Sequence, residues 1–245
     1  MTEKISDLES FSGSEIVGHR LINAKFPLIY LFEDVADAAE FEDLYAIQAI
    51  TNPRIQTEVG NLSLLSLDEI PFGIPGCRYA AASFTHVNPE GSRFSDGSYG
   101  LMYIGDSSDT AVAEVKYHQN IYWSNIPNLR YDRFVFKELI CNFGVMSGLD
   151  ATTLPKDTLI YKADDYSYSR RLGWEIKQAG EYSALKYASV RNEKGVCFAL
   201  FTPKEVVGVI QSKHYEMIWD GVRISSVNLI LKGETGASAE GSGAL

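Results

Sequence analysis

Apolar and polar positions along the chain follow two different spacings, and each spacing predicts one kind of element. Over residues 34–52, apolar side chains recur at an approximately helical interval, and Pro53 disfavours a longer helix. Residues 168–179 have the same character and are followed by Gly180, a residue common just after a helix end. We therefore expect helices over both segments.

Short apolar runs bounded by turn residues predict strands in much of the rest of the chain. The expected strands cover 16–22, 61–67, 99–104, 133–143, 183–190, 196–201, 206–212 and 222–231. Residues 144–166 look like a polar connection with little pattern. Because strands outnumber helices and several adjoin tight turns, we expect a single α+β domain with a curved, mainly antiparallel sheet and packed helices.

The two ends of the chain differ from its middle in composition. Residues 1–13 are polar and are expected to form an arm or a short helix. Residues 232–245 are rich in Gly, Ser and Ala, a composition typical of a disordered tail or linker. We expect the folded domain to cover residues 14–231.

One further helix is expected over residues 110–120, where the Ser107–Asp109 segment offers an N-cap. Glu114 lies inside this helix among Ala and Val residues. A carboxylate in such apolar surroundings is costly to bury unless it has a partner or a use. The alternative is that Glu114 faces water on an amphipathic helix, and the spacing alone leaves both interpretations open.

The composition of the chain limits the classes of binding partner that we expect. The chain has 245 residues, with 22 Lys and Arg against 32 Asp and Glu, so its net charge is −10. An acidic surface repels nucleic acid and anionic membranes, so we expect neither as a direct partner. The first ten residues are polar and acidic, unlike a signal peptide, and no apolar run approaches the roughly 20 residues of a membrane span. We expect a cytoplasmic protein.

Motifs that would indicate other chemistry are absent from the sequence. Three widely spaced cysteines, Cys77, Cys141 and Cys197, favour a reducing compartment and small core side chains over disulfides or a zinc site. The four histidines form no metal-binding pattern, so we expect no metal. There is no Gly-rich dinucleotide or Walker motif. Ser189 lacks the GxSxG context of a nucleophile, which argues against acyl transfer.

Several short segments, in one order along the chain, resemble the RES domain, a family named for an Arg, a Glu and a Ser. The segments cover roughly residues 14–230. They are His19-Arg20, Thr51-Asn-Pro-Arg54, Ser92-Arg93-Phe94, Tyr103, Glu114, Tyr187-Ala-Ser189-Val-Arg191, the strand 195–201 and Trp219-Asp-Gly221. Many compact members have Gly-Gly-Arg-Trp-Asn around the second Arg, whereas this chain has Gly-Ser-Arg-Phe-Ser. In this segment the chain is similar to the longer subgroup of the family, which includes ADP-ribosyltransferase-like toxins.

The resemblance implies a function, partners and a fold. RES proteins are toxins of bacterial toxin–antitoxin pairs and consume NAD, so it implies NAD as a substrate, a cognate Xre-like antitoxin as a partner, and an ADP-ribosyltransferase-like fold. It implies an NAD glycohydrolase or phosphorylase that cleaves the nicotinamide–ribose bond. The alternative is a mono-ADP-ribosyltransferase that modifies a protein target, and a non-catalytic binding module is the third possibility.

The resemblance also implies roles for individual residues. Glu114 would stabilise the oxocarbenium-like ribose, with Arg20 and Ser189 as its catalytic partners. Arginine suits the two phosphates of NAD because its planar guanidinium donates two parallel hydrogen bonds. The implied NAD-binding residues are Arg20, Arg93, Tyr103, Arg54 and Arg191. Without the resemblance, we would interpret Tyr103 as a core aromatic residue and Ser189 as a turn residue. Arg54 and Arg191 would be interpreted as surface ion-pair partners.

Overall fold

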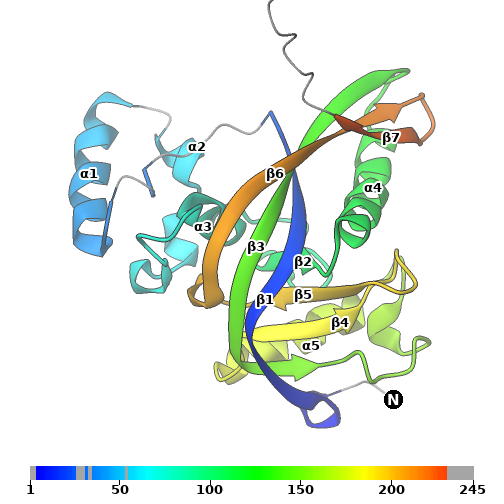
Figure 1. Ribbon diagram of the computed structural model, residues 1–245, viewed down its shortest axis with the longest axis horizontal. Helices are drawn as coiled ribbons and strands as arrows, with labels where there is room; N and C mark the ends of the chain where they lie inside the picture. The colour runs from blue at the N-terminus through cyan, green and yellow to red at the C-terminus, as the bar shows by residue number, and fades with distance from the viewer. Residues whose placement is uncertain (1–3, 26–30, 33–34, 53–54, 231–245) are drawn as a thin grey trace, which may run out of the picture.

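The computed structural model describes residues 4–25, 31–32, 35–52 and 55–230, which form one seven-stranded sheet with five α-helices (Figure 1). The strands are Glu9–Asn23 (β1), Met102–Gly105 (β2), Asp132–Asp150 (β3), Ala184–Ala188 (β4), Val196–Leu200 (β5), Val206–Trp219 (β6) and Ile224–Ile230 (β7). The helices are Ala38–Thr51 (α1), Ile55–Val59 (α2), Cys77–Thr85 (α3), Ser108–Ser124 (α4) and Ser167–Ala179 (α5). The expected single α+β domain is confirmed.

The sheet has the strand order β1-β2-β5-β4-β3-β6-β7, with an additional pairing between β1 and β3. Because of that extra pairing, β1, β2, β5, β4 and β3 close into a ring, and β6 and β7 extend from β3. Only β3 and β4 pair in parallel, so the expectation of a mainly antiparallel sheet is also confirmed. Figure 1 shows β1, β3 and β6 as three long, curved strands that run side by side.

Several details differ from the sequence-based expectation. The first strand starts at Glu9 instead of residue 16, so Glu9–Gly13 pair with β3 and do not form an arm. Residues 62–64 and 67–69 form 3₁₀ turns where a strand over 61–67 was expected. Strand β6 continues to Trp219, beyond the expected end at residue 212. Strand β3 continues to Asp150 through residues expected to be a connection, because β1 and β4 pair with that part of it. The buried helix α3 was not expected, because its segment is short and mixes apolar and polar residues.

Some of the expected helix ends agree with the structure, whereas α1 begins at Ala38 instead of residue 34 and α4 continues to Ser124 instead of ending at residue 120. Helix α4 starts after Ser107, whose hydroxyl accepts a hydrogen bond from the Thr110 backbone N–H at 3.2 Å. Helix α5 ends at Gly180, which has the left-handed backbone conformation (φ 72°) that glycine tolerates best. Among the described residues, no helix is both long and apolar enough to span a membrane.

Aromatic packing fixes the two segments that carry the candidate residues. At the C-terminal end of α4, Trp123 stacks on Phe134 of β3 with ring centroids 3.7 Å apart. In the loop before β2, Phe94 is fully buried and meets the edge of the Tyr187 ring at 4.8 Å. Helix α5 presses on the same loop at Gly173, where a Cβ atom would lie 1.9 Å from the Phe94 carbonyl oxygen.

This close approach gives a stability prediction. Gly173→Ala should lower the free energy of unfolding by about 1–3 kcal/mol, although alanine is the better helix former, because the methyl group overlaps backbone that cannot move freely. Gly144→Ala is the matched control, since its Cβ would meet nothing nearer than 3.6 Å. Denaturant midpoints of both variants check this; equal midpoints would show that α5 shifts without cost.

Candidate functional site

Glu114 lies on α4 and reaches across to the end of β4. The Ser189 hydroxyl donates to its Oε1 at 2.6 Å, and only 22% of the Glu114 side chain is exposed. Ser189 is itself buried, and its oxygen accepts the backbone N–H groups of Arg191 (3.1 Å) and Asn192 (2.9 Å). Glu114 is therefore a partly buried carboxylate with a fixed orientation, and the interpretation of it as a fully water-facing residue is wrong.

The two oxygens of this carboxylate have different surroundings. Oε1 accepts from Ser189 and lies 3.9 Å from the Cys197 thiol. Burial, and then the nearby Glu114 charge, raise the pKa of Cys197, so this thiol stays protonated. Oε2 lies 4.0 Å from Nε2 of the half-exposed His118, one helical turn along α4. Oε2 is therefore the oxygen with remaining capacity for a ligand.

Arg93 is buried and held mainly by neutral groups. Its Nη1 donates to the carbonyl oxygens of Ile160 and Lys162, each at 3.1 Å, and its guanidinium lies 4.5 Å from the centre of the Tyr166 ring. Its Nη2 is buried and has no hydrogen-bond partner within the described part of the chain. An arginine held this way keeps its full charge and a donor to spare.

Arg191 is held in the same manner. Its Nη2 donates to the Ala163 carbonyl at 2.6 Å, its guanidinium lies 3.2 Å from the centre of the Tyr117 ring, and its buried Nε finds no partner in the described segments. Partial burial lowers the pKa of His118, Glu114 raises it, and Arg191 and Arg93 lower it further. Glu114, Arg191 and Arg93 therefore all influence the pKa of one histidine ring.

Arg20 and Tyr103 lie beside this cluster. Arg20, on β1, donates from Nη1 to the Tyr103 carbonyl at 2.8 Å, and burial lowers the pKa of its guanidinium. The Tyr103 hydroxyl lies 2.7 Å from the Ser92 hydroxyl and accepts the Phe94 backbone N–H at 3.0 Å. Burial raises the pKa of Tyr103 to about 12, so the phenol stays protonated. Its clearest role is to hold the loop that carries Arg93.

A cavity of about 740 Å³ opens next to these residues, a volume within the usual range for small-molecule sites. Arg20, Tyr103 and Ser92 line it, together with Val115 of α4, whereas Glu114, Ser189, Arg93 and Arg191 are not among its lining residues. The structure thus brings most of the expected residues into two neighbouring groups. Arg54 lies outside the described residues.

Sequence reasoning missed several residues of this region. Tyr117 and His118 follow Glu114 by three and four positions on one helix, so helical spacing could have indicated that they share its surroundings. Tyr166 gave no signal, because only the fold brings it to Arg93. Within the described ranges, no three His, Cys, Asp or Glu side chains are grouped so as to hold a metal ion.

A second carboxylate supports the site from the other face of the sheet. Glu138 of β3 is fully buried, 2.9 Å from Nδ1 of His19, and accepts a hydrogen bond from Ser108 at the start of α4. Burial tends to raise the pKa of Glu138, but the hydrogen bonds from Ser108 and His19 hold it below its usual value. Glu138 therefore ties β1, β3 and α4 together.

Comparison with known proteins gives a family match and similar proteins. The RES domain family model matches residues 70–220. An uncharacterized protein of Sinorhizobium fredii, y4oC, is 27% identical over 210 residues, covering 84% of each chain. The crystal structure of the M. tuberculosis MbcT-MbcA toxin-antitoxin complex contains a chain with a TM-score of 0.41 and 11% identity, covering 82% of this chain and 87% of the other. 

The family match includes Arg93, Tyr103, Glu114 and Ser189, and begins after Arg20. It spans residues 70–220 of a 245-residue chain, which is well over half of the sequence. The chain belongs to the RES domain family.

Proposed function

We propose that this protein is a toxin that consumes NAD by cleaving the bond between nicotinamide and ribose, and that a cognate antitoxin neutralises it. Membership of the RES family supports NAD as the substrate. The observation that carries the proposal is the pairing of Glu114 with Ser189 beside two arginines that each retain an unsatisfied N–H. A carboxylate and spare cationic donors are what a ribosyl diphosphate needs.

The proposed reaction breaks the bond between ribose C1′ and the nicotinamide nitrogen. The bonding electrons leave with nicotinamide, which becomes neutral, so no strong general acid is required. The ribose passes through an oxocarbenium-like state, and Glu114 stabilises its positive charge through Oε2 while Ser189 holds Oε1. An oxygen of water or phosphate then bonds to C1′, and with water a proton is released to solvent.

The arginines account for binding of the diphosphate. Arg93 and Arg191 are fixed by carbonyl oxygens and aromatic rings, and no carboxylate of the described residues forms an ion pair with either. Their spare N–H groups would donate charge-assisted hydrogen bonds to phosphate oxygens. Arg20 reaches the same region from β1 and would contact the phosphates from the cavity side.

The antitoxin is proposed to act by covering the cavity. RES proteins occur as toxin–antitoxin pairs, and an Xre-like DNA-binding protein is the expected partner. With a net charge of −10, this chain would leave DNA binding to that partner. Arg20 lines the cavity, and a carboxylate of the partner would compete with NAD for it there.

The first prediction concerns Glu114. Glu114→Gln keeps an acceptor for Ser189, so the fold should persist, while NAD turnover should fall by about 10² or more, roughly 2.7 kcal/mol of transition-state stabilisation. Nicotinamide release measures it, with products identified by mass with and without phosphate. Glu175→Gln is the control, because Glu175 pairs with Arg171 on the exposed side of α5. Unchanged turnover in Glu114→Gln would remove the assigned role.

The second prediction concerns Arg93. Arg93→Lys should weaken NAD binding by about 1.5–3 kcal/mol, since the ammonium lacks the planar fork that serves two carbonyls and a phosphate together. Calorimetry on the Glu114→Gln background measures affinity without turnover. Arg171→Lys, an exposed arginine on α5, is the control. Equal affinities for Arg93→Lys and its parent would contradict phosphate binding by Arg93.

The third prediction concerns the antitoxin. Added antitoxin should lower NAD turnover in proportion to its concentration. Arg20→Ala should weaken the complex of toxin and antitoxin, because it removes a cation that lines the cavity. Titration of turnover, with size-exclusion chromatography to confirm binding, checks both points. A complex that forms and still cleaves NAD at the full rate would show that inhibition by occlusion is wrong.

A further inference from the structure

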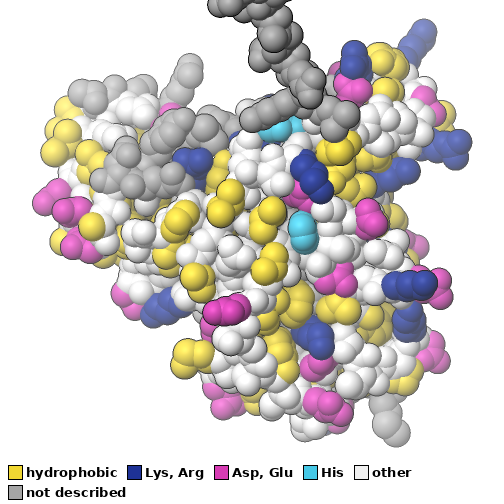
Figure 2. Space-filling model, viewed as in Figure 1, with side chains coloured by type: hydrophobic (Ala, Val, Ile, Leu, Met, Phe, Trp, Pro, Cys, Tyr) yellow, Lys and Arg dark blue, Asp and Glu magenta, His cyan; other side chains and the backbone are white. Residues whose placement is uncertain are grey.

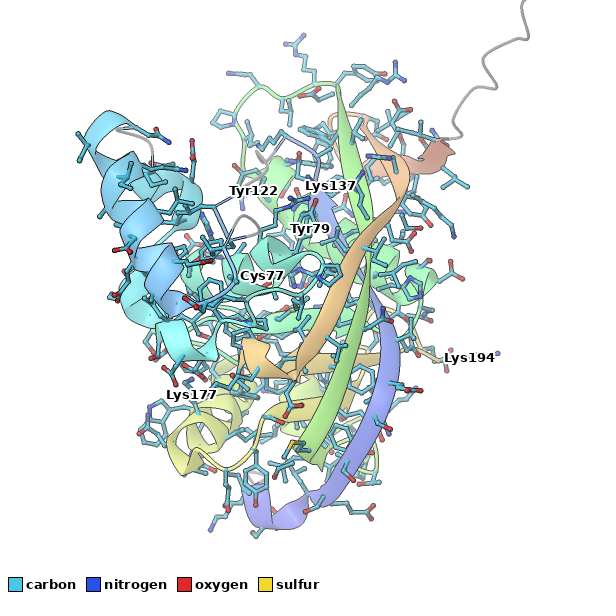
Figure 3. The ribbon with its side chains drawn as sticks, turned by 60° about the vertical axis from the view of Figure 1, so that its left-hand side comes forward. Cys77, Tyr79, Tyr122, Lys137, Lys177 and Lys194 are labelled. Atoms are coloured by element: carbon cyan, nitrogen blue, oxygen red, sulfur yellow. The ribbon has the colours of Figure 1, made fainter. Side chains whose placement is uncertain are left out.

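Two further polar residues, Lys137 and Tyr79, line the cavity and come from parts of the sequence outside α4. Lys137 of β3 and Tyr79 of α3 both line the cavity and are only 5% and 8% exposed. The Lys137 ammonium lies 5.5 Å from the centre of the Tyr79 ring, and Figure 3 shows the two side chains close together. None of the roles assigned above uses them.

The strand register puts Lys137 next to Arg20. In the β1–β3 pair, Arg20 is opposite Leu139 and Ile22 is opposite Lys137. Since alternate residues of a strand share a face, Arg20 and Lys137 point to the same face as diagonal neighbours. Both line the cavity, so two positive charges lie side by side at its wall.

These groups lack the partners that burial demands. The Tyr79 hydroxyl is buried without a hydrogen-bond partner, and Lys137 forms no ion pair or hydrogen bond, across residues 4–25, 31–32, 35–52 and 55–230. The carboxylate of Glu58 also lines the cavity, but it accepts from the Asn52 side chain at 3.2 Å. Unpaired buried donors and adjacent like charges are both unfavourable, and a bound anion would satisfy them together.

We propose that Lys137, the Tyr79 hydroxyl and Arg20 form a binding site for a phosphate dianion at the α3 side of the cavity. Two positive charges match the charge of a phosphate monoester or of inorganic phosphate, and the phenol adds a neutral donor. The phosphate comes either from free inorganic phosphate or from the 2′-phosphate of a phosphorylated dinucleotide. Its place in a reaction rests on the proposed function; its binding does not.

The direct test is calorimetric titration of the full chain with inorganic phosphate against chloride at matched ionic strength. The parent should bind phosphate saturably, Lys137→Met at least about tenfold more weakly, and Tyr79→Phe several-fold more weakly. Methionine retains the length of the lysine stem, and phenylalanine retains the ring. Matched controls are Lys194→Met and Tyr122→Phe, both exposed; Figure 3 shows Lys194 far from Lys137.

A second pair of titrations separates the two phosphate sources, on the Glu114→Gln background. If the site takes a 2′-phosphate, NADP binds more tightly than NAD and Lys137→Met removes the difference. If it takes free phosphate, phosphate still binds when NAD is saturating, and Lys137→Met abolishes that binding. Either result supports the site.

Two results would overturn the site: no saturable phosphate binding by the parent, or Lys137→Met and Tyr79→Phe that match their controls. Because Tyr79→Phe loses only a hydroxyl, its result can be interpreted even if Lys137→Met fails to fold. Failure of the proposed function is distinguishable. If the protein binds phosphate through Lys137 but does not cleave NAD, the phosphate site stands and the proposed function fails. If it cleaves NAD but does not bind phosphate at Lys137, the proposed function stands and the phosphate site fails.

Discussion

The pairing of β1 with β3 is the constraint on which the rest of the site depends. It runs from Glu9 to Asn23 and decides which side chains face the cavity. On one face it places Arg20 and Lys137, and on the other His19 and Glu138, which join the start of α4 through Ser108. A slip of β1 by one residue would turn Arg20 away from the face that carries Lys137 and would separate His19 from Glu138. The Glu138 contacts therefore protect the register as well as the packing.

The candidate site holds arginine side chains inside a protein whose net charge is negative. Figure 2 shows acidic and basic side chains interspersed with apolar ones on the visible face, without a continuous basic stripe there. Inside, Arg93 and Arg191 are held by carbonyl oxygens and aromatic rings in place of carboxylates. Neutral oxygens satisfy N–H groups without cancelling charge, so an anion that bound there would meet cations whose attraction is strengthened by low local dielectric. The site can thus oppose a net charge of −10.

The sequence was informative where the signal is local. The Ser107 cap and the Gly180 end of α5 follow from neighbouring residues, and the structure has them as expected. Prediction failed where tertiary contacts decide. Helix α3 is only nine residues long and directly follows a run of turn residues, and the end of β3 is a strand only because β1 and β4 pair with it. The partners of Arg93 come from a loop some seventy residues away, and the unsatisfied hydroxyl of Tyr79 has no sequence signature.

The closed ring of strands has an uneven strength that matters for motion. Strands β1 and β3 pair along almost their whole length, whereas β1 and β2 pair only at His19 and Gly105. Local opening begins where few backbone hydrogen bonds must break. The ring is therefore weakest at the β1–β2 junction, and β2 leads into α4, the helix that carries Glu114. Opening there would separate Arg20 from the Tyr103 carbonyl while the long β1–β3 pairing stays in place.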